Sequence, residues 1–153
     1  MCRRLSRLLA KNHPNRVRAA IRFDAALSRR IYAGADALLM PSRYEPCGLA
    51  QMNAMRYGCV PVARATGGLR DTMIDAGEET MAPPPASATG FLFTEANAST
   101  LALALQRMLK IYANRERWEQ PQQNGMRQDF SWSRAARQYA DLYQKLITQR
   151  ENR

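Results

Sequence analysis

Residues 42–51 read Ser42-Arg43-Tyr44-Glu45-Pro46-Cys47-Gly48-Leu49-Ala50-Gln51, and the short apolar run 37–40 precedes them. A run of four apolar residues that is followed by Pro41 is typical of a buried parallel strand. From Leu49 onward the apolar side chains recur at helical spacing, and this pattern stops at Gly58. The sequence therefore predicts a strand, then a tight turn that contains Glu45, and then a helix.

The predicted turn has the features of an anion site. The backbone N–H groups of Cys47, Gly48 and Leu49 would open the helix, where unpaired donors and a partial positive charge favour a phosphate group. Gly48 would let the backbone approach a ligand closely, and Glu45 would place a carboxylate beside it. A purely structural interpretation stays open, because an acidic residue and a proline are both favourable near a helix start without any ligand.

A second turn of the same kind follows along the chain. Residues 60–63 predict another short strand, and Thr66, Gly67 and Gly68 lie between this strand and a helical pattern that ends near residue 74. The carboxyl ends of parallel strands share one edge of a sheet, which is the edge where ligands bind. Two such turns on adjacent strand–helix units therefore predict a ligand site more strongly than either turn alone.

Strand and helix patterns alternate along the whole chain. The expected elements up to residue 93 are a helix with Leu5, Leu8 and Leu9 on one face, strands over residues 17–23, 35–40, 60–63 and 90–93, helices over residues 24–34, 47–57 and 67–74, and a loop over residues 76–89. Three helices are expected after residue 93. The first starts at Asn97 or Ser99, the second covers residues 116–126 with a break near Pro121, and the third starts at Ser131 or Ser133. This order predicts an α/β fold, a partial Rossmann-like doubly wound parallel sheet with C-terminal helices, and about four strands where about six are usual.

The composition is that of an ordinary globular domain. The chain has 153 residues, of which 46% are hydrophobic and 24% are charged, and this is enough for one domain with a modest core. The net charge of +10 comes from basic residues that crowd at both ends without interleaved aromatic residues. We interpret them as solvated helix faces and expect no nucleic-acid partner. No apolar run approaches the roughly 20 residues of a membrane span, so we expect no membrane partner.

The cysteine and histidine residues predict no metal site. Cys2, Cys47 and Cys59 lack metal-ligand spacing, and they indicate free thiols in a reducing, cytoplasmic compartment. The single histidine, His13, lies in a polar turn and is interpreted as a surface residue.

The two turns, Ser42-Arg43-Tyr44-Glu45-Pro46-Cys47-Gly48-Leu49 and Thr66-Gly67-Gly68-Leu69, resemble the paired signatures of bacterial glycogen synthases and plant starch synthases. The resemblance runs from near Leu9 to Trp132. It implies a GT-B glycosyltransferase that transfers glucose from ADP-glucose to the non-reducing end of an α-1,4-glucan with retention of configuration, without a cofactor. This chain would be the later part of the C-terminal, nucleotide-sugar domain.

The resemblance also implies roles for particular residues. Glu45 would be the catalytic residue, which holds the glucose hydroxyls and favours positive charge at the sugar ring, as a stabiliser or as a nucleophile. The ADP-glucose site would consist of Phe23, Glu45, Cys47, Gly48, Leu49, Thr66, Gly67 and Gly68. Phe23 stands where the family usually places a tyrosine against the adenine, although the sequence alone favours a core position for this ring.

Some parts of the family pattern are absent from the sequence. Asn53 stands where the broader fold class often has a second glutamate, Ala50 replaces a usual threonine, and Ala65 replaces a basic residue. The Arg and Lys that clamp the diphosphate and the acceptor-binding N-terminal domain would precede Met1. We therefore expect either a shortened gene product or one piece of a longer chain, with the missing N-terminal half as a partner.

Two domains and three functions are considered. Residues 1–130 would form the partial nucleotide-sugar-binding domain, and residues 131–153 a C-terminal helix that in the family packs back towards the N-terminal domain. The first hypothesis is a synthase that is catalytic only when its missing half completes it. The alternatives are a GT-B glycosyltransferase with another donor, and a non-catalytic fragment that binds nucleotide or packs against a partner.

Overall fold

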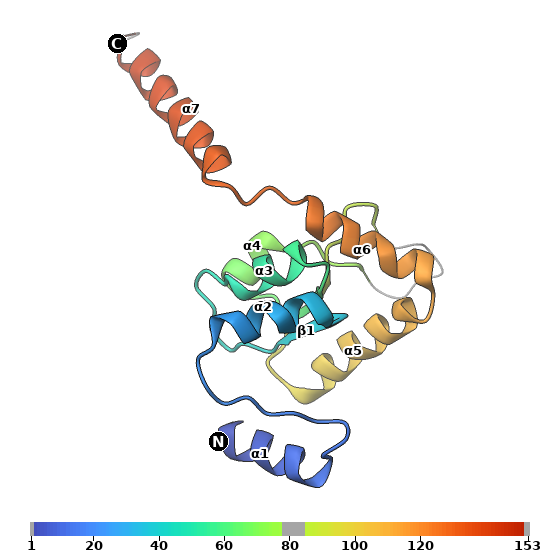
Figure 1. Cartoon of the computed structure of the whole chain (residues 1–153). Helices are drawn as coiled ribbons and strands as arrows, with labels where there is room; N and C mark the ends of the chain where they lie inside the picture. Colours follow the sequence, from blue (N-terminus) through green and yellow to red (C-terminus); the bar gives the residue numbers. More distant parts are fainter. Residues whose placement is uncertain (1, 78–84, 152–153) are drawn as a thin grey trace. The chain divides into compact units, whose positions relative to one another are not determined.

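The computed structural model describes residues 2–77 and 85–151, and Figure 1 shows their course. The chain divides into two compact units, Met1–Arg30 and Ile31–Arg153. The predicted division at residue 130 stays a prediction.

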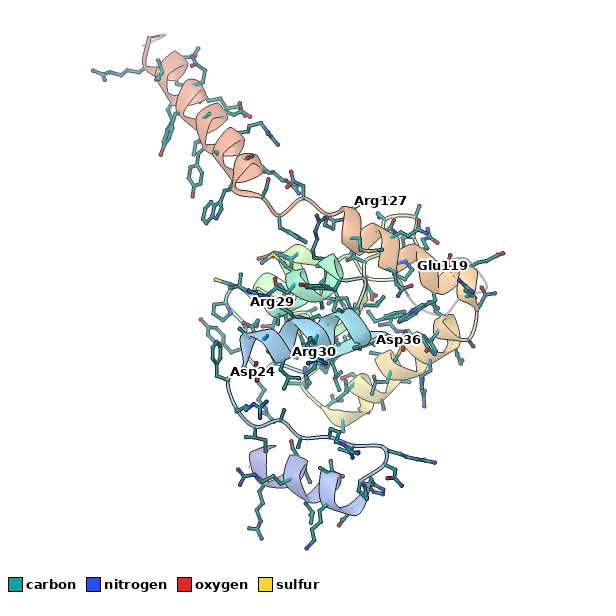
Figure 2. All side chains as sticks on the ribbon, in the orientation of Figure 1. Asp24, Arg29, Arg30, Asp36, Glu119 and Arg127 are labelled. Carbon is teal, nitrogen blue, oxygen red and sulfur yellow. The ribbon has the colours of Figure 1, made fainter. Side chains whose placement is uncertain are left out.

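The first unit contains α1 (Cys2–Asn12) and the beginning of α2 (Ala25–Gly34). Asp24 caps α2 as predicted, because its Oδ1 atom accepts a hydrogen bond of 2.9 Å from the backbone N–H of Leu27. Asp24 also pairs with Arg22 at 3.0 Å, and Figure 2 labels Asp24 at the start of the helix. The Leu27 N–H and the Arg22 guanidinium lower the pKa of the Asp24 carboxyl.

The prediction of a strand over residues 17–23 is wrong, because this segment has irregular backbone. The alternation of charged and apolar residues is a strand pattern, but a strand also needs a hydrogen-bonded neighbour. No segment in the described part of the chain pairs with residues 17–23. The sequence pattern is local, whereas the pairing that makes a strand is not.

The second unit is built on a parallel sheet of three strands, β1 (Ala37–Met40), β2 (Val60–Arg64) and β3 (Phe91–Phe93). Their order in the sheet is β1-β2-β3, and both strand pairs are parallel. The first residues of β1 and β2 lie opposite each other, and Val62 of β2 lies opposite Phe91 of β3. The parallel α/β fold is therefore confirmed, with three described strands in place of the expected four.

Helices cover both faces of this sheet. On one face, α5 (Ala98–Tyr112) and α6 (Arg115–Arg127) pack on β2 and β3. The buried side chains of that cluster include Val60, Val62, Phe91, Phe93, Ala104, Met108, Ile111 and Trp118. On the other face, α3 (Ala50–Arg56) and α4 (Gly68–Thr72) bury Met55, Ala63, Leu69 and Met73. The strand residues alternate between the two clusters, as the side-chain period of two requires.

The outer edge of β3 is closed by two side chains. The backbone N–H of Leu92 donates to Asp75 Oδ1 at 2.6 Å, and the Leu92 carbonyl accepts a hydrogen bond from Arg107. Asp75 and Arg107 form an ion pair at 3.2 Å. These two side chains occupy the backbone groups that a further strand would need beside β3.

Helix α6 continues through Pro121, so the predicted break at this residue is wrong. A proline inside a helix lacks one backbone donor and normally costs about 3 kcal/mol. Pro121 is fully buried here, and Trp118 and Gly125 of the same helix are buried beside it in the sequence pattern of that face. The Trp118 ring stacks on Phe91 with a centroid separation of 6.4 Å. We infer that the packing of this helix face offsets the lost hydrogen bond.

The two remaining alternatives for helix starts are settled. Asn97 is the N-cap of α5, because its Oδ1 accepts a hydrogen bond of 2.9 Å from the backbone N–H of Thr100. Helix α7 (Trp132–Glu151) begins directly after Ser131, whose carbonyl accepts from the N–H of Arg134 at 3.2 Å. Of the predicted loop over residues 76–89, residues 78–84 lie outside the described part.

The apolar face of α7 is exposed. Tyr139, Tyr143, Leu146 and Ile147 lie on it, and each of these side chains is more than half exposed. The expected packing of this helix towards an N-terminal domain stays a prediction. None of the helices in residues 2–77 and 85–151 has the length and apolar character that crossing a bilayer requires.

Cys59, directly before β2, gives a pH-dependent prediction. Burial, with a smaller contribution from Asp36, raises the pKa of its thiol to about 11 from an ordinary 9.0. The neutral thiol therefore stabilises the fold below pH 9, and this contribution is lost as the pH rises through 11. We expect the free energy of unfolding to fall between pH 9 and pH 11 by on the order of 1 kcal/mol more in the wild type than in Cys59→Ala. Urea denaturation at a series of pH values measures it, and equal losses in both proteins would contradict the assignment.

Candidate functional site

The two glycine turns that the sequence singled out are in contact. The backbone N–H of Gly68 donates to the Glu45 carbonyl at 3.1 Å. A Cβ atom on Gly68 would lie 1.7 Å from the Cys47 carbonyl oxygen, and one on Gly67 would lie 2.0 Å from the Glu45 carbonyl oxygen. Gly67 also has a φ angle of +45°, which side chains disfavour. Both glycines are therefore required for the turn after β2 to pack on the turn after β1.

Helix α3 begins at Ala50 with Leu49 as N-cap, so Cys47 and Gly48 precede the helix and do not open it as predicted. The reason is the conformation of Gly48, whose φ angle of +69° is incompatible with a right-handed helix. Gly48 is buried, and a Cβ atom on it would lie 2.5 Å from Gln51 Oε1. The glycine is thus needed for the turn itself, whatever approaches it from outside.

Backbone donors are nevertheless present at this edge of the sheet. In the described part of the chain, no residue accepts a hydrogen bond from the N–H groups of Cys47, Gly48, Leu49 or Gly67. The N–H of Thr66 donates to the Arg64 carbonyl at 2.8 Å, so it is already engaged within the protein, as is that of Gly68. Four of the six predicted amide donors therefore have no acceptor within the described part of the chain.

Glu45 lies in the middle of the first turn and is half-buried. Its Oε2 atom accepts a hydrogen bond of 3.3 Å from the Ser42 hydroxyl. The carboxylate thus belongs to the same turn as the N–H groups of Cys47 and Gly48. A carboxylate next to a set of N–H donors suits a reaction in which positive and negative charge develop on neighbouring groups.

Gln51 and Thr72 join the two turns, and sequence reasoning assigned no role to either. Gln51 is fully buried, and its Nε2 atom donates to the Gly48 carbonyl at 2.7 Å and to Thr72 Oγ1 at 2.9 Å. The Thr72 hydroxyl in turn donates to the Gly68 carbonyl. This bridge fixes Gly48 in one turn relative to Gly68 in the other. The only feature of the sequence that pointed to this bridge was the position of Gln51, three residues after Gly48.

Phe23 is not a core residue, and that interpretation is wrong. Its side chain is 98% exposed, since it extends from the irregular segment that replaces the predicted strand. Phe23 belongs to the Met1–Arg30 unit, whereas the other seven predicted site residues belong to Ile31–Arg153. Its contact with an adenine stays a prediction. Within the described residues no cluster of three or more His, Cys, Asp or Glu side chains could hold a metal ion.

Comparison with known proteins identifies the family. The family model described as "Glycosyl transferases group 1" matches residues 6–125, which is most of the chain. The chain belongs to the group 1 glycosyl transferases. Both glycine turns lie inside the matched region of this group 1 glycosyl transferase chain.

Several relatives of this glycosyl transferase chain are named glycogen synthases. It is 49% identical over 141 residues to "Glycogen synthase 2" of Nitrosococcus oceani, a match that covers 92% of this chain and 28% of that protein. It is 46% identical over 147 residues to the glycogen synthase of Thermodesulfovibrio yellowstonii, a match that covers 96% of this chain and 27% of that protein. The chain thus spans little more than a quarter of the length of these relatives.

Two solved structures are similar to the fold. One is the catalytic domain of starch synthase IV from Arabidopsis thaliana bound to ADP and acarbose, with a TM-score of 0.80 and 38% identity over 95% of this chain and 30% of that chain. The other is sucrose-phosphate synthase from Thermosynechococcus elongatus, with a TM-score of 0.66 and 31% identity over 95% of this chain and 34% of that chain. Both likenesses confirm the α/β fold of this glycosyl transferase chain.

The contact between the turns predicts a large difference between two glycine substitutions. Gly68→Ala puts a methyl group onto the Cys47 carbonyl, so the turns must separate, and we expect a loss of about 3 kcal/mol or more in the free energy of unfolding. Gly34→Ala at the end of α2 is the control, because a Cβ atom there has no neighbour within 4 Å. Urea denaturation measures both variants. A Gly68→Ala protein as stable as Gly34→Ala would show that the turns do not touch.

Proposed function

We propose that this chain is the ADP-glucose-binding part of a glycogen (starch) synthase. Completed by an acceptor-binding half, it transfers glucose to the non-reducing end of an α-1,4-glucan with retention, in the cytoplasm. The observation that carries the proposal is the contact between the two glycine turns, which gathers Glu45 and unused backbone donors at the carboxyl ends of β1 and β2. The similarity to proteins named glycogen synthase supports this choice of donor and acceptor.

In the proposed mechanism, one set of groups stabilises negative charge on the diphosphate and another stabilises positive charge on the sugar ring. As the bond from glucose to the diphosphate breaks, negative charge grows on the departing diphosphate, and the N–H groups of Cys47, Gly48, Leu49 and Gly67 stabilise it. Thr66 and Gly68 shape the second turn around these donors. The Glu45 carboxylate binds the glucose hydroxyls and stabilises positive charge at the ring. The exposed ring of Phe23 offers a face for the adenine.

A second candidate function is nucleotide binding without transfer. The chain spans 28% of the length of the Nitrosococcus oceani relative, and the N–H donors of the two turns can bind a phosphate group whether or not an acceptor is present. In this case the same turns bind the nucleotide, and the chain acts only through a partner. Transfer with a different donor is the less supported alternative, because the similarity to starch synthase IV exceeds that to sucrose-phosphate synthase.

The nucleotide preference of the chain tests the donor. We expect ADP to bind more tightly than UDP by about tenfold, which corresponds to about 1.4 kcal/mol, because the family resemblance implies an adenine site. Isothermal titration calorimetry with each nucleotide measures the two dissociation constants. The Arg56→Met variant, which changes an exposed side chain of α3, serves as control and should bind as the wild type does. Equal affinities would contradict ADP-glucose as the donor.

The role of Glu45 is tested in a completed enzyme. Residues of this chain replace the matching 28% of the Nitrosococcus oceani protein, and transfer of labelled glucose from ADP-glucose to glycogen is followed. We expect Glu45→Ala to lower kcat by about a hundredfold or more while the affinity for ADP changes less than twofold. Glu45→Gln is the matched variant that keeps the shape and removes the charge. Normal turnover in Glu45→Ala would remove this residue from the mechanism, and an inactive chimera that still binds ADP would favour binding without transfer.

A further inference from the structure

Arg64, the last residue of β2, holds the backbone on both sides of its strand. Its Nε atom donates to the Ser42 carbonyl at 2.8 Å, and a terminal nitrogen donates to the Arg43 carbonyl. The other terminal nitrogen reaches the Thr94 carbonyl at 3.4 Å. One guanidinium group thus connects the turn after β1 with the segment after β3.

These hydrogen bonds distinguish Arg64 from an arginine that binds a ligand directly. Its Nε and both terminal nitrogens are committed to carbonyl oxygens of the chain, and a planar guanidinium directs all its donors in one plane. The side chain is therefore oriented towards the backbone of the turn. This side chain can affect a ligand through the residues of that turn.

Ser42 is the residue through which this effect passes. Its carbonyl accepts from Arg64, while its hydroxyl donates to Glu45 Oε2 at 3.3 Å. Within the described residues, Ser42 is the only side chain or backbone group that donates to the Glu45 carboxylate. The position of the carboxylate therefore depends on the position of the Ser42 backbone, which Arg64 fixes.

We propose that Arg64 is a positioning residue that holds the Glu45 carboxylate in place for the sugar of the nucleotide-sugar donor. This inference rests on the proposed function. It adds a residue on the central strand to that site, and it assigns this residue to recognition of the sugar and not of the nucleotide.

The first test measures the turn without any ligand. Backbone ¹⁵N relaxation of the whole chain gives order parameters for Ser42, Arg43 and Glu45 in the wild type, Arg64→Lys and Arg64→Met. We expect values near 0.85 in the wild type to fall below about 0.6 in Arg64→Met, with Arg64→Lys between them. Arg56→Met is the matched control, because Arg56 also donates to a backbone carbonyl, that of Met126, but outside the turn. Unchanged order parameters in Arg64→Met would overturn the proposal.

The second test separates positioning from a general structural role. Calorimetry with ADP-glucose and with ADP should show that Arg64→Met weakens ADP-glucose about tenfold and ADP less than twofold. Because Arg64 acts through Glu45, the double variant Arg64→Met/Glu45→Ala should bind ADP-glucose as Glu45→Ala does alone. Equal weakening of both ligands, or additive losses in the double variant, would overturn the proposal.

Failure of the positioning role of Arg64 and failure of the proposed function give different results in these two tests. A wild-type chain that binds neither ADP nor ADP-glucose contradicts the proposed function for this chain. Arg64 is then judged by the order parameters, where loss of order confined to the turn supports its positioning role and unchanged order refutes it.

Discussion

The packing of two backbone turns, one on the other, is the constraint on which the site depends. Gly67 and Gly68 leave no room for side chains because the carbonyl groups of Glu45 and Cys47 occupy that space. This contact can form only if β1 and β2 are adjacent and parallel, since both turns then leave the sheet at the same edge. The bridge from Gln51 to Thr72 and the Arg64 guanidinium reinforce an arrangement that the glycines make possible.

The fold was predictable wherever its cause is local. The apolar runs of β1, β2 and β3, and the caps Asp24 and Asn97, depend on neighbouring residues, so the sequence contains the information directly. Predictions failed where a distant partner decides the outcome. Residues 17–23 have the pattern of a strand but no described neighbour, and Pro121 stays helical because the core buries its face of α6. Phe23 is exposed because the segment 17–23 that carries it has no described strand partner to pack against.

The two turns were predictable from the sequence, but the contacts that join them were not, and the assignment of their residues to a site stays a prediction. The pattern around Glu45, Cys47 and Gly48 identified the first turn, while the positive φ angle of Gly48 moved the start of α3 to Ala50. Arg64 and Gln51 were visible in the sequence without an assigned role, because their partners lie 22 and 21 residues away and only the folded chain brings them together. Family resemblance proposes which residues belong to a site, and the tertiary contacts explain how those residues are held.

The closed edge of β3 has a consequence for association between copies of the chain. Because Asp75 and Arg107 occupy the outward backbone groups of Leu92, a strand from another chain finds neither the donor nor the acceptor of this residue free at the β3 edge. The ion pair between Asp75 and Arg107 that completes the packing of α5 on β3 therefore also protects this edge of the sheet from pairing with a second copy.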